Sequence, residues 1–362
     1  MEQLKSGMKG NINKYLNFIA YCLNEDVADT ITTGIDFTEL YIFSQQQAIV
    51  GVVFDGIDKL SKVRNIEISK ELLFEWIGQC NLIETRNRLL NQRVLELVSY
   101  FQNNGFKSCI LKGQGNAKMY PKPYLRMSGD IDIWVDGSKA DIVNFIHSKF
   151  PGIIVAYHHM DFPLFNDVEV EVHYHPSYSY NYFHNHRLQK FFQNHGKEQF
   201  ENIIEEGYSV PTINFNLIFQ LSHMMRHFFT QGIGLRHAID YYYLLKKAGN
   251  IDENNLLHVL KECGMYKFFT SIMWIETQVL GLNNPFNSIT PNEKAGKLVL
   301  HEMIKGGNFG KQYTHWNDNV FINYFNQFVY NMRYIVEFPD EPITRPINIV
   351  CDYIRRHLFK QL

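Results

Sequence analysis

The chain has 362 residues, 45% of them hydrophobic, so it can bury a substantial core and form two or three subdomains. Its 35 Lys and Arg residues against 37 Asp and Glu residues give a formal net charge of −2, which argues against an extended nucleic-acid surface. No run approaches the roughly 18 consecutive apolar residues of a membrane span, so we expect no membrane partner and a cytoplasmic location. The cysteines lack the spacing of zinc or redox pairs and are expected to be reduced core residues: Cys22, Cys80, Cys109, Cys263 and Cys351.

Residues 1–105 carry helical periodicity. Apolar residues from Phe43 to Phe54 recur at about 3.6 positions, which predicts a helix over 43–54. A longer pattern begins after Ser69, a candidate N-cap, and continues to Phe101. It stops before Gly105, which suits a left-handed C-cap, so we expect a long helix that ends there.

Residues 106–180 mix strand and helix patterns. Strands are predicted at 109–111, 130–135, 153–157 and 167–174, with a short helix at 116–120. The spacing of Ser138 and Asp141 is that of a capping box and predicts a helix from 139.

From 181 to 362 the helical period returns, as in 217–228 and 235–245. The sequence therefore predicts an α+β fold: a small mixed β-sheet core at 106–180, flanked by an N-terminal helical region at 1–105 and a C-terminal one at 181–362.

Carboxylates lie at alternate positions of two predicted strands. Because side chains alternate across a strand, Asp130 and Asp132 share one face, and Glu169, Glu171 and His173 share one face of the later strand. Neighbouring acids repel each other and resist burial, and hard divalent ions such as Mg²⁺ take oxygen ligands. This pattern predicts a metal site for phosphoryl or nucleotidyl transfer.

Cationic and glycine residues near the first carboxylates suit phosphate binding. Gly113 stands between a strand and a helix, where the backbone can approach a triphosphate. Lys112 offers a point charge, and Arg126 offers a planar fork for phosphate oxygens.

Together these motifs resemble the polymerase-beta-type nucleotidyltransferase superfamily, most closely the bacterial family of uncharacterised nucleotidyltransferases. The resemblance rests on Leu111-Lys112-Gly113, Tyr120-Pro121, Arg126, Ser128-Gly129-Asp130-Ile131-Asp132 and Glu171-Val172-His173. It implies transfer of a nucleoside monophosphate from an NTP, expected to be ATP, to an unknown acceptor, with release of pyrophosphate. It also implies two Mg²⁺ ions, or Mn²⁺, on Asp130, Asp132 and Glu171, with Glu169 as the reserve choice.

The resemblance also implies a set of nucleotide-binding or substrate-binding residues. These are Lys112, Gly113, Gln114, Arg126, Ser128, His173, His227, Arg236 and Asp240. Gln114 departs from the pattern, because the best-known members of the superfamily have Gly or Ser there.

Two other functions stay open at this point. A nucleotidyltransferase-like scaffold without activity could bind a nucleotide or a protein, since folds persist with altered chemistry. A metal-dependent hydrolase is suggested by the histidines, although none of them stands in a His-Glu-x-x-His signature, which favours structural or surface roles for most. His173 is the exception, because it shares a strand face with Glu171. The acceptor, whether a small molecule, a sugar, a protein or an RNA end, is not specified by the sequence.

Overall fold

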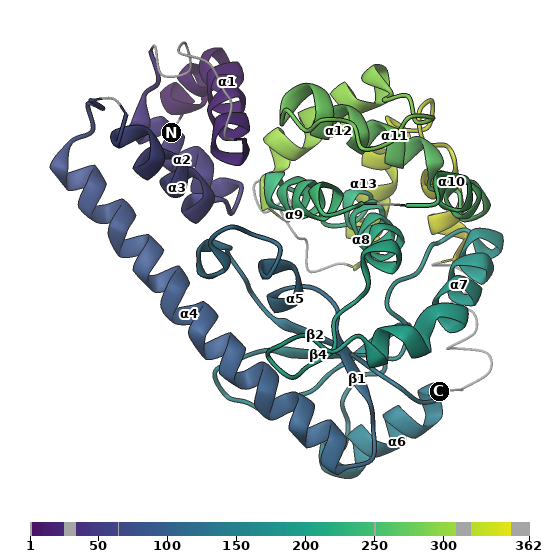
Figure 1. The fold of residues 1–362 in the computed structure, drawn as a ribbon. Coiled ribbons are helices and arrows are strands. Elements are labelled where there is room, and N and C mark those ends of the chain that lie inside the picture. Colours follow the sequence, from purple (N-terminus) through teal and green to yellow (C-terminus); the bar gives the residue numbers. More distant parts are fainter. Residues whose placement is uncertain (1, 25–33, 64, 250, 309–319, 349–362) are drawn as a thin grey trace.

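A four-stranded mixed sheet lies between two groups of helices in the computed structural model (Figure 1). The structure describes residues 2–24, 34–63, 65–249, 251–308 and 320–348. The chain has an α+β fold with helical flanks, as the sequence predicts. No helix in these ranges combines the length and apolar character needed to cross a membrane.

The N-terminal flank ends in a helix that reaches the sheet. Its helices are α1 (Glu2–Leu23), α2 (Phe37–Gln46), α3 (Val50–Ser61) and α4 (Lys70–Asn103). Ser69 caps α4 by accepting a hydrogen bond from the Leu72 amide, and Gly105 has a φ of 84° just beyond its end, so both predicted boundary signals are confirmed.

The helix predicted over 43–54 is wrong, because the chain breaks between α2 and α3. Ala48 has a φ of 56°, a left-handed conformation that no helix interior contains. Apolar periodicity continues on both sides of the break, so the pattern does not reveal it. The turn lets α3 fold back and pack against α1.

The sheet is built from four short strands. They are β1 (Ser108–Ile110), β2 (Ile131–Val135), β3 (His159–Asp161) and β4 (Val170–His173). Their order is β1-β2-β4-β3, with β2 and β4 parallel and both outer pairs antiparallel. The turn after β1 leads to the one-turn helix α5 (Gln114–Ala117), and α6 (Lys139–Lys149), capped by Ser138, follows β2.

The strand predicted at 153–157 is wrong, because β3 begins at His159. Residues 153–156 pair with no strand, and Ile154 is 82% exposed. β3 contains only one apolar residue, Met160, and its strand form depends on backbone pairing with β4. Tertiary pairing therefore overrides the local apolar run.

The two faces of the sheet have different environments. One face packs Ile131, Ile133, Val170 and Val172 into an apolar core with α4 and α6. This core contains residues of α4 and of the sheet, so it crosses the predicted boundary at residue 105. The division into three regions, 1–105, 106–180 and 181–362, stays a prediction. The opposite face carries Asp132, and Trp134 on that face stacks on Phe215 at a ring separation of 5.6 Å.

The C-terminal part of the described chain contains α7 (Tyr182–Glu201), α8 (Ile213–Phe228), α9 (Leu235–Lys246), α10 (Glu253–Glu262), α11 (Tyr266–Trp274), a π-helical segment (Ile275–Val279), α12 (Glu293–Gly306) and α13 (Val320–Met332). Of these, α7 and α8 pack on the second face of the sheet, where Phe200 and Phe215 contact Trp134. Cys22, Cys80, Cys109 and Cys263 are free and buried, as predicted, and Cys351 lies outside the described residues.

We expect Gly51→Ala to destabilise the fold. A Cβ at Gly51 on α3 would lie 2.1 Å from the carbonyl oxygen of Leu125, in the segment that leads to Arg126. Relieving this overlap should lower the free energy of unfolding by about 1–3 kcal/mol in urea titrations. Gly78→Ala on α4 is the control, since nothing lies within 4 Å of that position, and it should be neutral or stabilising by up to about 1 kcal/mol. Equal stability of both variants would contradict the close approach.

Candidate active site

A cavity of about 190 Å³ lies between the second face of the sheet and helices α8 and α9. Most of its lining side chains are polar. From the sheet and the segments beside it come Lys112, Gly113, Asn116, Arg126, Gly129, Asp130, Asp132, His158, His159 and Glu171. From α8, α9 and the turn between them come Gln220, His223, Met224, Arg226, His227, Gln231, Arg236, His237 and Asp240.

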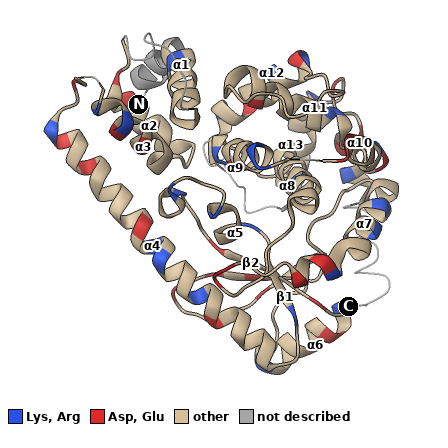
Figure 2. Cartoon of the chain, viewed as in Figure 1, with Lys and Arg blue, Asp and Glu red and all other residues tan. Residues whose placement is uncertain are grey.

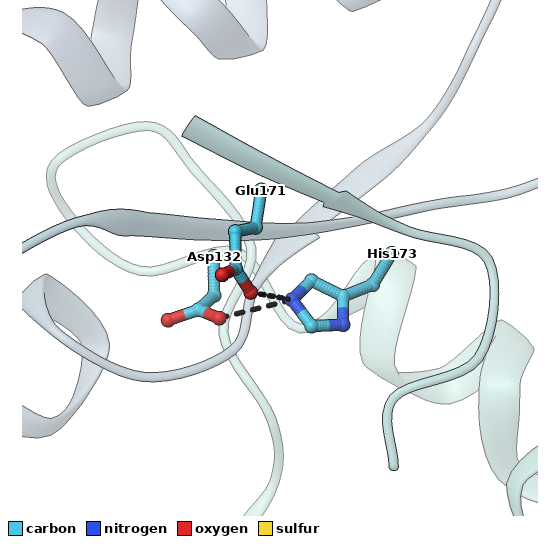
Figure 3. A group of neighbouring side chains, drawn as sticks. All are labelled: Asp132, Glu171 and His173. Carbon is cyan, nitrogen blue, oxygen red and sulfur yellow. Dashed lines mark hydrogen bonds and ion pairs between the residues drawn. The ribbon is translucent and has the colours of Figure 1, made fainter. Parts of the chain in front are cut away.

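Parallel pairing of β2 with β4 brings the central groups together. Asp132 stands opposite Glu171 in the register, so their side chains emerge on the same face. Nε2 of His173 lies 2.9 Å from Asp132 Oδ1 and 3.4 Å from Glu171 Oε2 (Figure 3). Potential ligand atoms of these three residues lie within 4.8 Å of one another. Two carboxylates and an imidazole this close fit the donor set of a divalent cation.

The Asp132 carboxylate is ionised despite its burial. Its side chain is 2% exposed, and Lys112 Nζ lies 2.8 Å from Oδ1. Burial alone would raise the pKa of Asp132, but the Lys112 ammonium and the His173 ring lower it well below its usual range. Burial likewise lowers the pKa of His173, yet its bonds to the two carboxylates raise it overall. The negative charges of Asp132 and Glu171 therefore lie next to the positive charges of Lys112 and His173.

The other predicted acids occupy different positions. Asp130 immediately precedes β2 and lines the same cavity, where the charge of Asp132, and then burial, raise the pKa of Asp130. It is not among the three residues whose ligand atoms converge, and its role as a metal ligand stays a prediction. Glu169 is exposed and does not line the cavity, so the arrangement favours Glu171 as the third acid.

Arg126 and Asp240 form a buried ion pair with each other. Arg126 Nε and Nη2 donate to the two Asp240 carboxylate oxygens at 2.7 and 2.6 Å, and Tyr120 donates to the same carboxylate at 2.6 Å. Burial would raise the pKa of Asp240, but the Arg126 guanidinium lowers it to about 2. These two predicted substrate residues join the loop before β2 to α9.

Of the remaining predicted residues, Gly113, His227 and Arg236 line the cavity, whereas Gln114 and Ser128 do not. Gln114 is buried against α4 and donates to Asn91, and Ser128 accepts a bond of 2.8 Å from Arg126 Nη1. Arg236 Nη1 donates to the Met127 carbonyl at 3.0 Å. Gly113 has a φ of 51°, where a side chain would be strained. The helix that follows Gly113 has a single turn, so its dipole adds little to anion binding.

Helix α8 contributes His223 and Arg226 to the cavity beside the predicted His227, and sequence reasoning assigned neither of these two a role. Arg226 Nη2 lies 3.1 Å from His227 Nε2 and 3.4 Å from His223 Nδ1. Burial, first of all, lowers the pKa of both histidines well below the usual range, so they are neutral near pH 7. In the part of the chain that the structure describes, no ion pair joins Arg226 to a carboxylate. The spacing of His223, Arg226 and His227 on one helix face was the available signal.

Comparison with known protein families gave one match. The model of the uncharacterised nucleotidyltransferase family matches residues 33–281. The chain belongs to this family. The match to this nucleotidyltransferase family spans α2 to the end of the π-helical segment and so includes the sheet, α8 and α9. Searches of the curated proteins and of the solved structures gave no match.

We expect Asp240→Asn to cost about 3–5 kcal/mol of unfolding free energy near pH 7, because it leaves the Arg126 charge buried without its partner. Tyr120→Phe, which removes one bond to the same carboxylate, should cost only about 1 kcal/mol. Since the pKa of Asp240 is lowered to about 2, the contribution of the pair is complete above about pH 4 and is lost as the pH falls towards 2. Urea titrations across this range should show the Asp240→Asn difference shrinking, and a constant difference would contradict the assigned charge.

Proposed function

We propose that the protein transfers a nucleoside monophosphate from an NTP, with ATP as the expected donor, to an acceptor in a Mg²⁺-dependent reaction that releases pyrophosphate. The observation that carries this proposal is the juxtaposition of Asp132 and Glu171 on paired strands, with Lys112 beside them in a polar cavity. Membership of a nucleotidyltransferase family supports the same reaction class.

The carboxylates supply the metal-binding part of the site. Asp132 and Glu171 would hold a divalent ion, with Asp130 beside them, and a bound ion would neutralise the charge that develops on the transferring phosphate. His173 contacts both carboxylates through Nε2 and holds their orientation. The orientation of the carboxylates thus depends on this buried imidazole and, for Asp132, also on Lys112.

Two cations are positioned for the phosphates. Lys112 stands at the end of β1, with its side chain 19% exposed. Arg226 enters the cavity from α8, and its guanidinium can bond two phosphate oxygens at once. Arg126 is committed to Asp240, so Arg226 takes the role that the sequence pattern suggested for Arg126.

The acceptor stays open among a small molecule, a sugar, a protein side chain and an RNA end. Acidic and basic positions are interspersed along α4 (Figure 2), so this helix carries no continuous basic stripe. The absence of an extended nucleic-acid surface stays a prediction. A cytoplasmic location likewise stays a prediction.

A second candidate is a metal-dependent hydrolase, which the histidines beside the carboxylates favour. Metal analysis separates the two, because tightly held zinc or iron would favour the hydrolase over weakly held Mg²⁺. Calorimetric NTP binding without pyrophosphate release would favour a nucleotide-binding scaffold without activity.

We expect Asp132→Asn to lower pyrophosphate release from ATP and Mg²⁺ by at least about 100-fold, because the central carboxylate is lost. Transfer of the label from α-phosphate-labelled ATP should fall in parallel. Glu169→Gln is the matched control: Glu169 is exposed and does not line the cavity, so its activity should stay within about twofold of the wild type. Full activity in a folded Asp132→Asn variant would refute the proposed reaction.

We expect Arg226→Gln to raise the NTP dissociation constant by roughly 10-fold to 100-fold, the effect of losing charge-assisted bonds to phosphate. Arg226→Lys should lie between this variant and the wild type, because lysine keeps the charge without the planar fork. Titration calorimetry measures both. Arg187→Gln on α7, where the arginine pairs with Glu262, is the control and should bind like the wild type.

A further inference from the structure

The Arg226 side chain reaches the cavity with little to fix its orientation on α8 itself. Its Nη2 atom lies 3.1 Å from Nε2 of His227 and 3.4 Å from Nδ1 of His223. Its Nε atom is buried and has no hydrogen-bond partner among the described residues. Because both histidine contacts reach the same nitrogen, they leave the plane of the guanidinium free to turn.

The ring of Tyr178 contacts the flat face of this guanidinium. Arg226 Cζ lies 5.2 Å from the centre of the ring. A cation over an aromatic face is attracted by the ring electrons, while the N–H groups at its edge stay available to an anion. Burial and the neighbouring Tyr180 raise the pKa of Tyr178, and the Arg226 charge opposes this rise, as a cation beside the phenol should.

Tyr178 is itself held by neighbouring rings. It lies in the segment between β4 and α7, shortly after His173. Its ring centre is 5.0 Å from that of Tyr157, 4.9 Å from that of His158 and 5.3 Å from that of Tyr180. Its hydroxyl also donates to the Tyr180 hydroxyl at 3.2 Å. The segment that follows β4 therefore places a packed aromatic ring against the arginine of α8.

Arg345 contacts both the aromatic pair and the end of α8. Its buried guanidinium has Cζ 5.3 Å from the centre of the Tyr180 ring. Its Nη1 donates to the Phe229 carbonyl at 2.8 Å, directly after the turn of α8 that carries Arg226. Arg345 belongs to the helical residues 340–348, which lie outside the family match to 33–281. A C-terminal segment thus supports Arg226 from two sides.

We propose that Tyr178, held by Tyr180 and Arg345, positions the Arg226 guanidinium for the phosphates of an NTP. This inference rests on the proposed function, because that function assigns Arg226 to the phosphates. Tyr178 does not line the cavity, so it acts through Arg226 and is a positioning residue. The affinity for the nucleotide then depends on residues that follow the family match.

A double-mutant cycle tests whether Tyr178 acts through Arg226. Titration calorimetry with Mg²⁺ measures binding of the ATP analogue that has a methylene bridge between its α- and β-phosphates to the full-length protein. Tyr178→Leu should raise the dissociation constant about 3-fold to 30-fold, the range of a lost contact between a cation and a ring. In the Arg226→Gln background the same change should have an effect below about twofold. Tyr178→Phe keeps the ring and should stay within about threefold of the wild type.

Inorganic triphosphate separates positioning of Arg226 from stacking on the base. Tyr178→Leu should weaken triphosphate and the ATP analogue by the same factor, because Arg226 is assigned to the phosphates. A loss confined to the ATP analogue would mean that the ring contacts the base, and it would overturn the proposal. Arg345→Gln is the second variant: it should raise both dissociation constants about 2-fold to 10-fold, and again only when Arg226 is present.

An exposed tyrosine near the same segment provides the matched control. Tyr182, at the start of α7, is 75% exposed, and Tyr182→Leu should bind both ligands like the wild type. Circular dichroism and thermal melting identify any variant that fails to fold. If Tyr178→Leu fails to fold, the cycle of Arg345→Gln with Arg226→Gln decides the question.

The outcomes separate this inference from the proposed function. Equal losses with and without Arg226 would overturn the positioning role and leave the proposed reaction standing. A wild type that shows the expected coupling but releases no pyrophosphate from ATP would overturn the proposed reaction and leave the positioning role in NTP binding. No binding of the ATP analogue by the wild type would overturn both.

Discussion

The buried carboxylate of Asp132 constrains the rest of this structure. A charge that is 2% exposed persists only with partners, and here Lys112 and His173 both contact Oδ1. These partners come from the end of β1 and from β4, so β2 must pair with strands on both sides for the charge to be stable. The same pairing places Glu171 opposite Asp132. The strand pairing that stabilises the charge of Asp132 is therefore the same pairing that assembles the site.

A second buried charge pair holds the opposite wall of the cavity. Arg126 and Asp240 connect the loop before β2 to α9 by two parallel bonds. Asn116 extends the connection, because it donates to Asp240 and accepts a bond of 2.9 Å from Gln220 on α8. Breaking such a pair leaves an uncompensated charge, which resists movement of the wall. The cavity thus has rigid polar walls on both the sheet side and the helix side.

The two arginines, Arg126 and Arg226, differ in what they contact. Arg126 stabilises the contact between the loop and α9, whereas Arg226 lies beside His223 and His227, whose pKa values burial lowers. Neutral neighbours do not cancel the charge of a guanidinium, so its attraction for an anion is retained. Asp240 binds Nε and Nη2 of Arg126, and the remaining nitrogen, Nη1, donates to Ser128.

The sequence by itself determined the α+β class, the long helix from Ser69 to Gly105 and the strand that carries Asp132, because periodicity, caps and strand alternation are local properties. The tertiary structure decided what local patterns do not encode. Strand order placed Glu171 opposite Asp132 and made β3 from His159 to Asp161, although the apolar run before it favoured 153–157. Only helix packing showed that Asp240 binds Arg126 and that Arg226 enters the cavity. Contacts between residues more than a hundred positions apart leave no periodic pattern in the sequence.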